Sequence, residues 1–588
     1  MTKQKKKFAR NTSKNNTSNQ AISKQSNLKS GASKKQKTNF DSSSDLLDII
    51  DNYLLKKQNL IFWILFAFSL LFSLLLFDLR VSVGGDDTTY LLKSQDFIKE
   101  FKYPAFQGPL YPIIISPFIA IFGMNLPVLK FLSFIFLGLN LFIFYRAFRN
   151  RIPATILLAT ILLISINSYM LFFASQTYAE AFFILAQTLF FIWFFKRFIE
   201  KEQQDFVILK EIPGFLLLGL FLLGLGLIKN IGYGAVFAVL IYFLFEKKWK
   251  SAGLSVVGFG VIYGVWQFFK YLVWSDSKTQ FTDQASTLFL KHPYDPSQGL
   301  ETLGGFVQRF FDNSNIYLSR QLFKVLGLRP ELIRVNGALV AVDTIPFLSF
   351  LVYVVIFLGF IYALHQNKFL KFTAIFLCVM MGITFIVLQP IWEAHRLIIP
   401  MLPLMIMILF TGFYQILKYK KLNFLQFLFP VLILIVFLGT FQRSSNVIKD
   451  HQKILNAHLR GNITAGFTPD WVNFINMSIW AAKNVPPDKV IASRKPSISA
   501  IYGKRRFFGI YSVESTDPDT LLNYLHQHKV EYVIAASLRK NEAQNTGEII
   551  NTIQRYLYFI QTKYPEKIRL VNQIGTPEEE PAYLFKIE

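Results

Sequence analysis

Cysteine and charged residues are both scarce in this chain of 588 residues. Only 17 % of the residues are charged, whereas 52 % are hydrophobic. A soluble chain of this length would form about four domains of roughly 150 residues each, but long uncharged runs recur between residues 59 and 441, so most of the chain is expected to face lipid. The single cysteine, Cys378, lies in an apolar run and has no partner within the chain, which excludes a secreted disulfide scaffold.

Several sequence motifs are also absent. The chain has no Gly-Lys-Ser/Thr loop of the kind that cradles nucleotide phosphates, so a nucleotide-driven pump is not expected. His and Cys do not cluster at the spacing of metal ligands, and we predict no metal site from them. We also find no inverted internal repeat of the kind common in secondary transporters.

Basic residues exceed acidic ones by 25, and many of them lie in the N-terminal tail and in short loops. Residues 1–40 contain eleven Lys or Arg and no acid. Such a segment cannot bury enough apolar surface to fold, so residues 1–57 are predicted to be a disordered cytoplasmic tail. The tail either attracts anionic lipid or is a solvated segment that helps to fix topology. This distribution of charge does not indicate a nucleic-acid partner.

The pattern of hydrophobic runs predicts a mainly α-helical, polytopic bundle. The stretch 109–123 is short and is broken by Pro112 and Pro117. If it lies on the membrane surface, every basic loop falls on the same side as the basic tail, as the positive-inside rule requires. We therefore expect about eleven spans between residues 58 and 442: 59–77, 127–145, 152–170, 176–195, 213–228, 230–245, 251–272, 345–364, 370–388, 397–417 and 422–441.

This topology places three segments outside the cytoplasm. Two are the loops 80–126 and 275–343. The third is the C-terminal region 443–588, which reads as a small extracytoplasmic α/β domain. Short strands are expected at 489–493, 531–536, 570–574 and 583–587, and helices at 517–528 and 548–562. The chain is thus predicted to be a multi-pass protein with a cytoplasmic N-terminus.

Isolated charges within apolar runs are the strongest functional candidates, because each costs about 2.5–3.5 kcal/mol at mid-bilayer. Glu180 is the only charge between Ile152 and Phe195, and Lys229 is the only charge between Ile212 and Phe245. Glu180 either marks the membrane surface or faces the bundle. Lys229 lies in the outer turn of a helical hairpin, where it either snorkels or belongs to a site.

Other candidates lie on the same outer face. Asp86 and Asp87 follow Gly84-Gly85 and are expected either to cap a helix running to about Glu100 or to act as a general base. Arg396 stands at the mouth of a span, next to His395, as a candidate phosphate ligand. Arg309, in the loop 275–343, is a weaker candidate because single basic loop residues are usually just solvated.

At these positions the chain resembles the GT-C-fold membrane glycosyltransferases, the group of protein O-mannosyltransferases and the lipid A aminoarabinose transferase. The matching features extend over about residues 59–588 and are short. They are Asp86-Asp87 followed by Tyr90, Gly108-Pro109-Leu110-Tyr111-Pro112 ending at Phe122-Gly123, Glu180 after a polar turn, Lys229-Asn230, Arg396 before Pro400 and Pro403, and Ala492-Ser493-Arg494-Lys495-Pro496 with Tyr532-Val533-Ile534. Many relatives have Asp-Glu where this chain has Asp-Asp, and often arginine where it has Lys229.

The resemblance implies a glycosyltransferase that uses a polyprenyl-phosphate sugar on the outer side of a membrane, and a bacterial plasma membrane is favoured. Asp86 would remove the proton of the acceptor hydroxyl, assisted or positioned by Asp87, and the anomeric configuration would invert. Lys229 and Arg396 would hold the donor phosphate and Glu180 a hydroxyl. Tyr90, Arg309 and His395 complete the candidate substrate-binding residues.

The partners implied are the lipid-linked donor, membrane lipids, and an acceptor that is a lipid, a polysaccharide or a protein. No cofactor is required, although a divalent cation at Asp86 and Asp87 is compatible with these residues. Two other classes remain open from the residues alone. One is a secondary transporter or lipid flippase that uses Glu180 and Lys229 along its pathway, and the other is a structural or receptor-like membrane protein.

Overall fold

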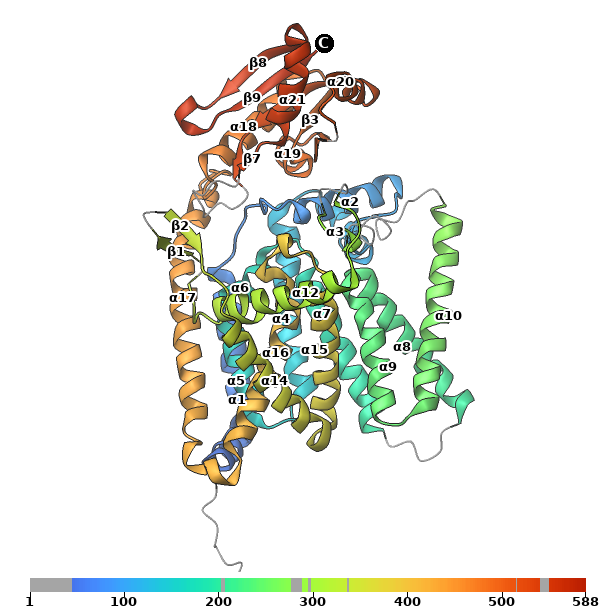
Figure 1. The fold of residues 1–588 in the computed structure, drawn as a ribbon, viewed down its shortest axis with the longest axis vertical. Coiled ribbons are helices and arrows are strands. Elements are labelled where there is room, and N and C mark those ends of the chain that lie inside the picture. The colour runs from blue at the N-terminus through green and yellow to red at the C-terminus, as the bar shows by residue number, and fades with distance from the viewer. Residues whose placement is uncertain are drawn as a thin grey trace, which may run out of the picture. The chain divides into compact units, whose positions relative to one another are not determined.

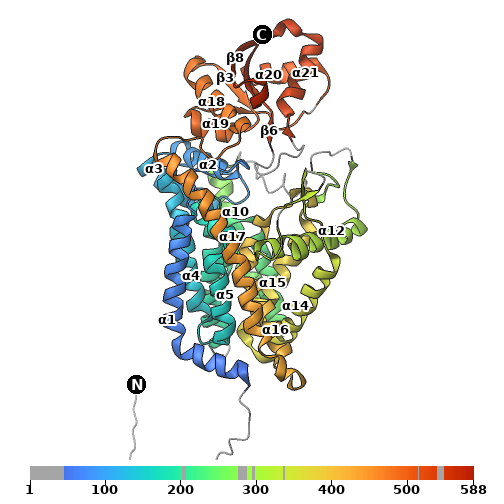
Figure 2. The ribbon, with the colours of Figure 1, turned by 90° about the vertical axis from the view of Figure 1, so that its left-hand side faces the viewer.

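A computed structural model describes residues 45–588, apart from 202–206, 276–287, 294–297, 331, 336–337, 514 and 540–548. The predicted disorder of residues 1–44 lies outside the described residues. Within the described part, the chain is a multi-pass membrane protein, and its long helices run roughly parallel to one another (Figure 1 and Figure 2).

In the described part of the chain, nine helices are long and apolar enough to cross a membrane. They are α1 (Leu46–Leu75), α4 (Leu126–Phe148), α7 (Glu180–Phe194) continued by η2 (Phe195–Glu200), α8 (Ile208–Ile228), α10 (Trp249–Val273), α14 (Pro346–Gln366), α15 (Lys368–Val387), the run from η7 (His395–Leu397) through η8 (Ile399–Met401) to α16 (Leu402–Leu417), and α17 (Leu428–Leu459) together with η9 (Lys420–Leu425).

The two remaining predicted spans are helical but irregular. The segment predicted at 152–170 is broken into two pieces. The first is α5 (Ala154–Ile166), and the second consists of α6 (Ser168–Leu171) and η1 (Phe172–Ser175). The two pieces meet at an angle of 61°. The break is at Asn167, whose side chain accepts a hydrogen bond from Met170 N and so caps the second piece. The other segment forms η3 (Asn230–Tyr233) and α9 (Gly234–Phe245), a shorter apolar helix.

Helix α1 begins before the predicted end of the tail at residue 57. Leu47, in its first turn, is buried, and its amide donates a hydrogen bond to Gln426. Lys418 Nζ also lies 2.6 Å from Asp48 Oδ1. These contacts with a distant part of the chain order residues 46–57, so the prediction of disorder is wrong for them. Composition alone does not reveal such contacts.

The predicted outer loops contain helices of their own. Segment 80–126 forms α2 (Asp86–Glu100) and α3 (Leu110–Phe122), which pack together. Helix α3 is too short for a regular span, as expected for the stretch 109–123. Segment 275–343 includes α12 (Leu303–Asn315), η5 (Ile316–Gln321), α13 (Leu322–Val325) and the hairpin β1–β2 (Leu332–Val335 and Ala338–Ala341), which we did not predict as regular elements.

Glycines and aromatic rings account for much of the helix packing. A Cβ on Gly412 of α16 would lie 2.1 Å from the carbonyl oxygen of Val355 in α14, so these two helices meet backbone to backbone. Phenylalanines fill the contact between α7 and α15, where the Phe194 and Phe372 rings stack 4.2 Å apart. Many of the phenylalanines in the described part of the chain thus serve as packing groups within the bundle.

The C-terminal region forms the expected α/β domain. Its five-stranded sheet has the order β4-β3-β5-β9-β8, in which β3 is parallel to β4 and β5 and the other pairs are antiparallel. The elements are α18 (Pro469–Asn484), β3 (Val490–Ser493), α19 (Pro496–Gly503), β4 (Phe508–Gly509), α20 (Pro518–Gln527), β5 (Val530–Ala536), β6 (Leu538–Arg539), β7 (Ile549–Ile550), α21 (Thr552–Lys563), β8 (Ile568–Ile574) and β9 (Ala582–Ile587).

The four predicted strands and both predicted helices of this domain are present, but the helix predicted at 548–562 begins only at Thr552, because Ile549–Ile550 form β7 and pair with β6. Elements α18, α19, β4, β6 and β7 are not anticipated by the sequence pattern. Asp517 caps α20 as expected, since it accepts a hydrogen bond from Thr520 N. Helices α18 and α21 supply buried residues to two separate apolar clusters, with Trp471 in one and Ile560 in the other. The predicted fold class, a helical bundle with a small α/β domain, is therefore confirmed.

Candidate functional site

A tight turn before α2 presents the acidic pair. Gly85 has φ +86, a conformation that glycine adopts without strain. Asp86 and Asp87 form the first turn of α2, and Gly85 is the N-cap. Of the two alternatives for the acidic pair, capping of this helix by an aspartate is therefore wrong, although the helix does run to Glu100. At this position the carboxylates gain from the helix dipole.

The two aspartates have different surroundings. Asp87 is fully buried, and its Oδ2 accepts a hydrogen bond from Ser82 N at 2.8 Å. Burial raises its pKa to about 6, against hydrogen bonds and the charge of Lys130, which lower it. The Asp86 side chain keeps 31 % of its surface exposed. Asp86 is thus the accessible carboxylate of the pair, whereas Asp87 stabilises the turn by accepting the hydrogen bond from Ser82 N.

Four charged side chains from distant parts of the sequence form a continuous ion network. Arg396 Nη2 lies 2.7 Å from Asp86 Oδ2, and Arg396 Nε lies 3.2 Å from Glu180 Oε1. Lys229 Nζ lies 2.7 Å from the same Glu180 oxygen. The structure therefore brings together Asp86 of the acidic pair, the isolated charges Glu180 and Lys229, and Arg396. In the following we call Asp86, Glu180, Lys229 and Arg396 the charge network.

Each member of the charge network is positioned by a helix end. Glu180 starts α7, Lys229 follows the last residue of α8, and Arg396 lies in the short helix η7 before α16. Glu180 is 1 % exposed and Lys229 9 %. Two carboxylates balance two cations, and this pairing offsets part of the cost of burying them. Arg396 also lies over the ring of Tyr178, 4.6 Å from its centre.

Tyr90 lies next to the charge network without making an ion pair. Its hydroxyl donates a hydrogen bond of 2.9 Å to Gln107 Oε1, and its ring meets Phe106 and Tyr111 edge to face. Burial and the negative charges of Glu180 and Asp86 raise the pKa of Tyr90 well above its usual value. Tyr90 therefore stays protonated and is a hydrogen-bond donor beside the network.

His395 and Arg309 lie in other groups of contacts. The His395 ring meets Tyr169 at 4.6 Å, and the guanidinium of Arg443 lies 4.4 Å from the centre of the same tyrosine ring. Arg309 donates to the carbonyls of Leu288 and Leu290 and pairs with Glu301 at 2.7 Å. None of these described contacts of Arg309 reaches the charge network, and their arrangement is that of a local structural clamp.

Two lysines outside the predicted set bind main-chain carbonyls, one in the segment before the acidic turn and the other in the turn itself. Lys130 is buried in α4, and its Nζ donates to the carbonyls of Asp78 and Ser175 at 2.8 Å each. Lys495 precedes α19 of the C-terminal domain and donates to the carbonyl of Gly84 at 3.0 Å. Lys130 is an isolated charge in an apolar run, so the criterion that selected Glu180 would also have found it.

The C-terminal domain therefore contacts the acidic turn directly. Besides Lys495, Ser497 lies 2.8 Å from the hydroxyl of Thr88. Burial and the charge of Arg494 lower the pKa of Lys495 to about 8, although Asp86 and Asp87 oppose this shift. The charge of Lys495 is then sensitive to mildly alkaline pH.

Metal ligands are not gathered in this region. Over the described ranges, no group of three or more His, Cys, Asp and Glu side chains is arranged to hold a metal ion. Asp86 is engaged by Arg396, and one Asp87 oxygen is engaged by Ser82. The other Asp87 oxygen, Oδ1, is buried without a hydrogen-bond partner.

Comparison with known proteins gives a fold rather than a family. No protein-family model matches the chain, and no curated protein matches its sequence. Among solved structures, the apo oligosaccharyltransferase of Archaeoglobus fulgidus matches with a TM-score of 0.52 at 10 % identity, over 88 % of this chain and 80 % of that one. ArnT from Cupriavidus metallidurans, bound to undecaprenyl phosphate, has a TM-score of 0.48 at 12 % identity, over 89 % of this chain and 97 % of that one. The predicted resemblance is confirmed at the level of the fold, which is GT-C-like.

Proposed function

We propose that the protein is an integral membrane glycosyltransferase that moves a sugar from a polyprenyl-phosphate donor to an acceptor hydroxyl on the extracytoplasmic face. The observation that carries this proposal is the charge network, which joins an accessible carboxylate to two cations at the ends of membrane helices. A transferase of this kind needs a base for the acceptor and fixed positive charge for the leaving phosphate. The GT-C-like fold is compatible with it.

Asp86 is the proposed base. It is the more exposed aspartate, and it stands at the beginning of α2. In the reaction, the proton of the acceptor hydroxyl passes to the Asp86 carboxylate while the acceptor oxygen bonds to the anomeric carbon. The bond from that carbon to the phosphate oxygen breaks, and its electron pair leaves with the polyprenyl phosphate. Attack opposite the leaving group inverts the configuration.

Arg396 and Lys229 are the proposed ligands of the donor phosphate. Both cations are already oriented by Glu180, whose single oxygen Oε1 lies within 3.2 Å of each. Fixed cations stabilise the negative charge that develops on the phosphate as the sugar leaves. In this assignment Glu180 holds the cations in place, which extends its expected role as a ligand of a hydroxyl. Asp87 holds the turn, and His395 lies beside the site through its neighbour Arg396.

The test is transfer from a synthetic polyprenyl-phosphate sugar by the purified full chain, with donor binding measured separately. Asp86→Asn should reduce the transfer rate by at least about 100-fold, as expected for the loss of a general base, while donor affinity is retained. Asp96→Asn is the matched control, because Asp96 lies on the same helix and pairs with Arg506 away from the network. Wild-type turnover in Asp86→Asn would remove Asp86 from the role of base.

The phosphate assignment has its own test. Lys229→Ala and Arg396→Ala should each weaken donor binding, because each removes a cation from the proposed phosphate site. Unchanged donor affinity in both variants would show that the phosphate binds elsewhere. The sidedness of the reaction is tested by adding the acceptor to one face of sealed vesicles in which the protein has a known orientation.

A further inference from the structure

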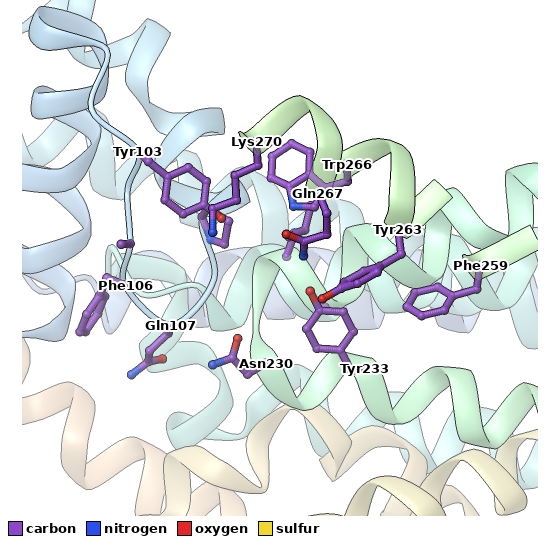
Figure 3. A pocket seen from close by; sticks show the side chains of 14 residues that line it. Tyr103, Phe106, Gln107, Asn230, Tyr233, Phe259, Tyr263, Trp266, Gln267 and Lys270 are labelled. Atoms are coloured by element: carbon purple, nitrogen blue, oxygen red, sulfur yellow. The ribbon is translucent and has the colours of Figure 1, made fainter. Parts of the chain in front are cut away.

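A pocket next to the charge network has a lining of unusual chemistry. It lies between the segment 103–109, the end of α8, helix η3 and the outer part of α10, and its volume is about 460 Å³ (Figure 3). This volume lies in the lower half of the range of small-molecule sites, about 300–1,000 Å³. Two of the lining residues connect it to the network: Asn230 follows Lys229, and Gln107 accepts the hydrogen bond from Tyr90.

Aromatic rings and carboxamides share the wall of the pocket. Figure 3 shows Tyr103 and Trp266 along one side and Gln107, Asn230 and Tyr233 along the opposite side, with Gln267 projecting between them. The ring of Tyr233 rests on Gly226, where a Cβ would come within 2.4 Å of it. The glycine thus makes room for this wall of the pocket.

The charge of the pocket is low. Lys270 is its single charged lining residue among those described, and no carboxylate lines it. The Lys270 side chain is buried, and its Nζ lies 4.7 Å from the centre of the Tyr103 ring. The positive charge of Lys270 therefore interacts in part with the face of the Tyr103 ring. The charge network offers the donor phosphate two cations, Lys229 and Arg396, whereas the described lining of the pocket offers only Lys270. The phosphate is therefore better placed in the network than in the pocket.

The carboxamides argue against an isoprenoid chain as the occupant. A hydrocarbon would cover the carboxamides of Gln107 and Gln267 without offering them any hydrogen-bond partner, and unmade hydrogen bonds are costly. A sugar ring has the complementary chemistry. Its C–H faces pack on aromatic rings, and its hydroxyls donate to and accept from carboxamides.

We propose that this pocket binds a neutral sugar ring, and the inference rests on the proposed glycosyltransferase function. The ring belongs either to the donor or to a carbohydrate acceptor, since both would present the same hydroxyls. The connections through Asn230 and Gln107 place its recognition beside Lys229 and Tyr90. The residues that determine sugar specificity are then Gln267, Trp266 and Asn230.

The test begins with binding rather than transfer. The full chain in lipid nanodiscs is titrated with methyl glycosides of neutral hexoses and pentoses, with ligand-observed saturation-transfer NMR as the readout. At least one glycoside should bind in the millimolar range. Gln267→Leu and Trp266→Phe should each weaken that binding by about three- to tenfold, which corresponds to the loss of one hydrogen bond or of part of a stacking surface.

The controls separate recognition from damage to the fold. Tyr271→Ala removes an exposed aromatic residue of the same helix that does not line the pocket, so it should leave glycoside binding unchanged. The thermal midpoint of each variant should match that of the wild type. Absence of binding by any glycoside, binding unaffected by both pocket variants, or displacement of the glycoside by an uncharged polyprenol would each overturn the proposal.

A second arm identifies the source of the ring. In the transfer assay, Gln267→Leu should raise the KM of the donor alone if the pocket holds the donor sugar, and that of the acceptor alone if it holds the acceptor. An unchanged KM for both would count against the pocket. The failure of the glycosyltransferase function can be told apart from the failure of the pocket. Asp86→Asn should lose transfer by at least about 100-fold yet still bind the glycoside, and glycoside binding by a wild type that shows no transfer would refute the transferase function alone.

Discussion

Glu180 should contribute more to the free energy of unfolding than Lys229, although the two side chains form one hydrogen-bonded ion pair. Glu180 contacts two cations, Lys229 at 2.7 Å and Arg396 at 3.2 Å. Among the described residues, Lys229 has a carboxylate within 4.0 Å only in Glu180. Glu180→Gln therefore leaves a buried ammonium without a counter-charge. Breaking a buried pair in this way costs about 3–5 kcal/mol.

Lys229→Met should cost less. The remaining carboxylate of Glu180 keeps its contact with Arg396, so the loss is close to that of one charge-assisted hydrogen bond, about 1.5–3 kcal/mol. The double variant Glu180→Gln/Lys229→Met should cost less than the sum of the single variants, because neither buried charge of the pair is left alone. A coupling energy of about 1–3 kcal/mol is expected between contacting residues.

The measurement is the free energy of unfolding of the four proteins in mixed micelles of fixed composition, with pulse proteolysis to read the folded fraction. Lys371→Met is a useful control, since Lys371 pairs with Glu246 at 2.6 Å at a less buried site. Two results would refute the reasoning. One is an equal loss in the single variants, and the other is a double variant whose loss is simply additive.

Three other outcomes follow from the structure. Burial raises the pKa of Asp87 to about 6 from 3.8, so between these values the folded state holds a proton that the unfolded state has lost. As the pH rises from 4 to 6, the wild type should therefore lose about 2 kcal/mol of unfolding free energy relative to Asp87→Asn; a difference that does not change with pH contradicts the burial of Asp87. The pKa of Lys495 is lowered to about 8, so the transfer rate should fall as the pH rises through this value. In Lys495→Arg the fall should move to higher pH, and a fall at the same pH as in the wild type would exclude Lys495 as its cause. Gly412→Ala should lower the thermal midpoint because its Cβ meets the Val355 carbonyl at 2.1 Å, whereas Gly382→Ala, in open space, should not; equal midpoints would contradict the close approach.

The parts of the fold set by hydropathy were predictable from the sequence. Every predicted span is helical, because each apolar run must satisfy its backbone hydrogen bonds within the bilayer. The bend at Asn167 was not predictable, since hydropathy averages over it and the capping hydrogen bond to Met170 is local. The ordering of residues 46–57 also escaped prediction, because it depends on Lys418 and Gln426, which are far away in sequence.

The candidate site was predictable as a set of residues and not as a set of pairs. A charge inside an apolar run must find a partner, which is why Glu180 and Lys229 stood out. The sequence does not say which charges meet. It assigned Lys229 and Arg396 to a phosphate, whereas the structure also shows both on one oxygen of Glu180. Lys130, another isolated charge in an apolar run, binds main-chain carbonyls, so an isolated charge indicates a contact and not necessarily a site.

The charge balance of the network bears on the order of events in the proposed reaction. Arg396 is shared between Asp86 and Glu180, and in this arrangement the proposed base is held by a cation. While this pair lasts, one oxygen of the Asp86 carboxylate is occupied by the Arg396 guanidinium. An arriving phosphate competes with Asp86 for the same guanidinium. Binding of the donor would therefore release Asp86 toward the acceptor, so that the base becomes effective only when a sugar is in place to be transferred.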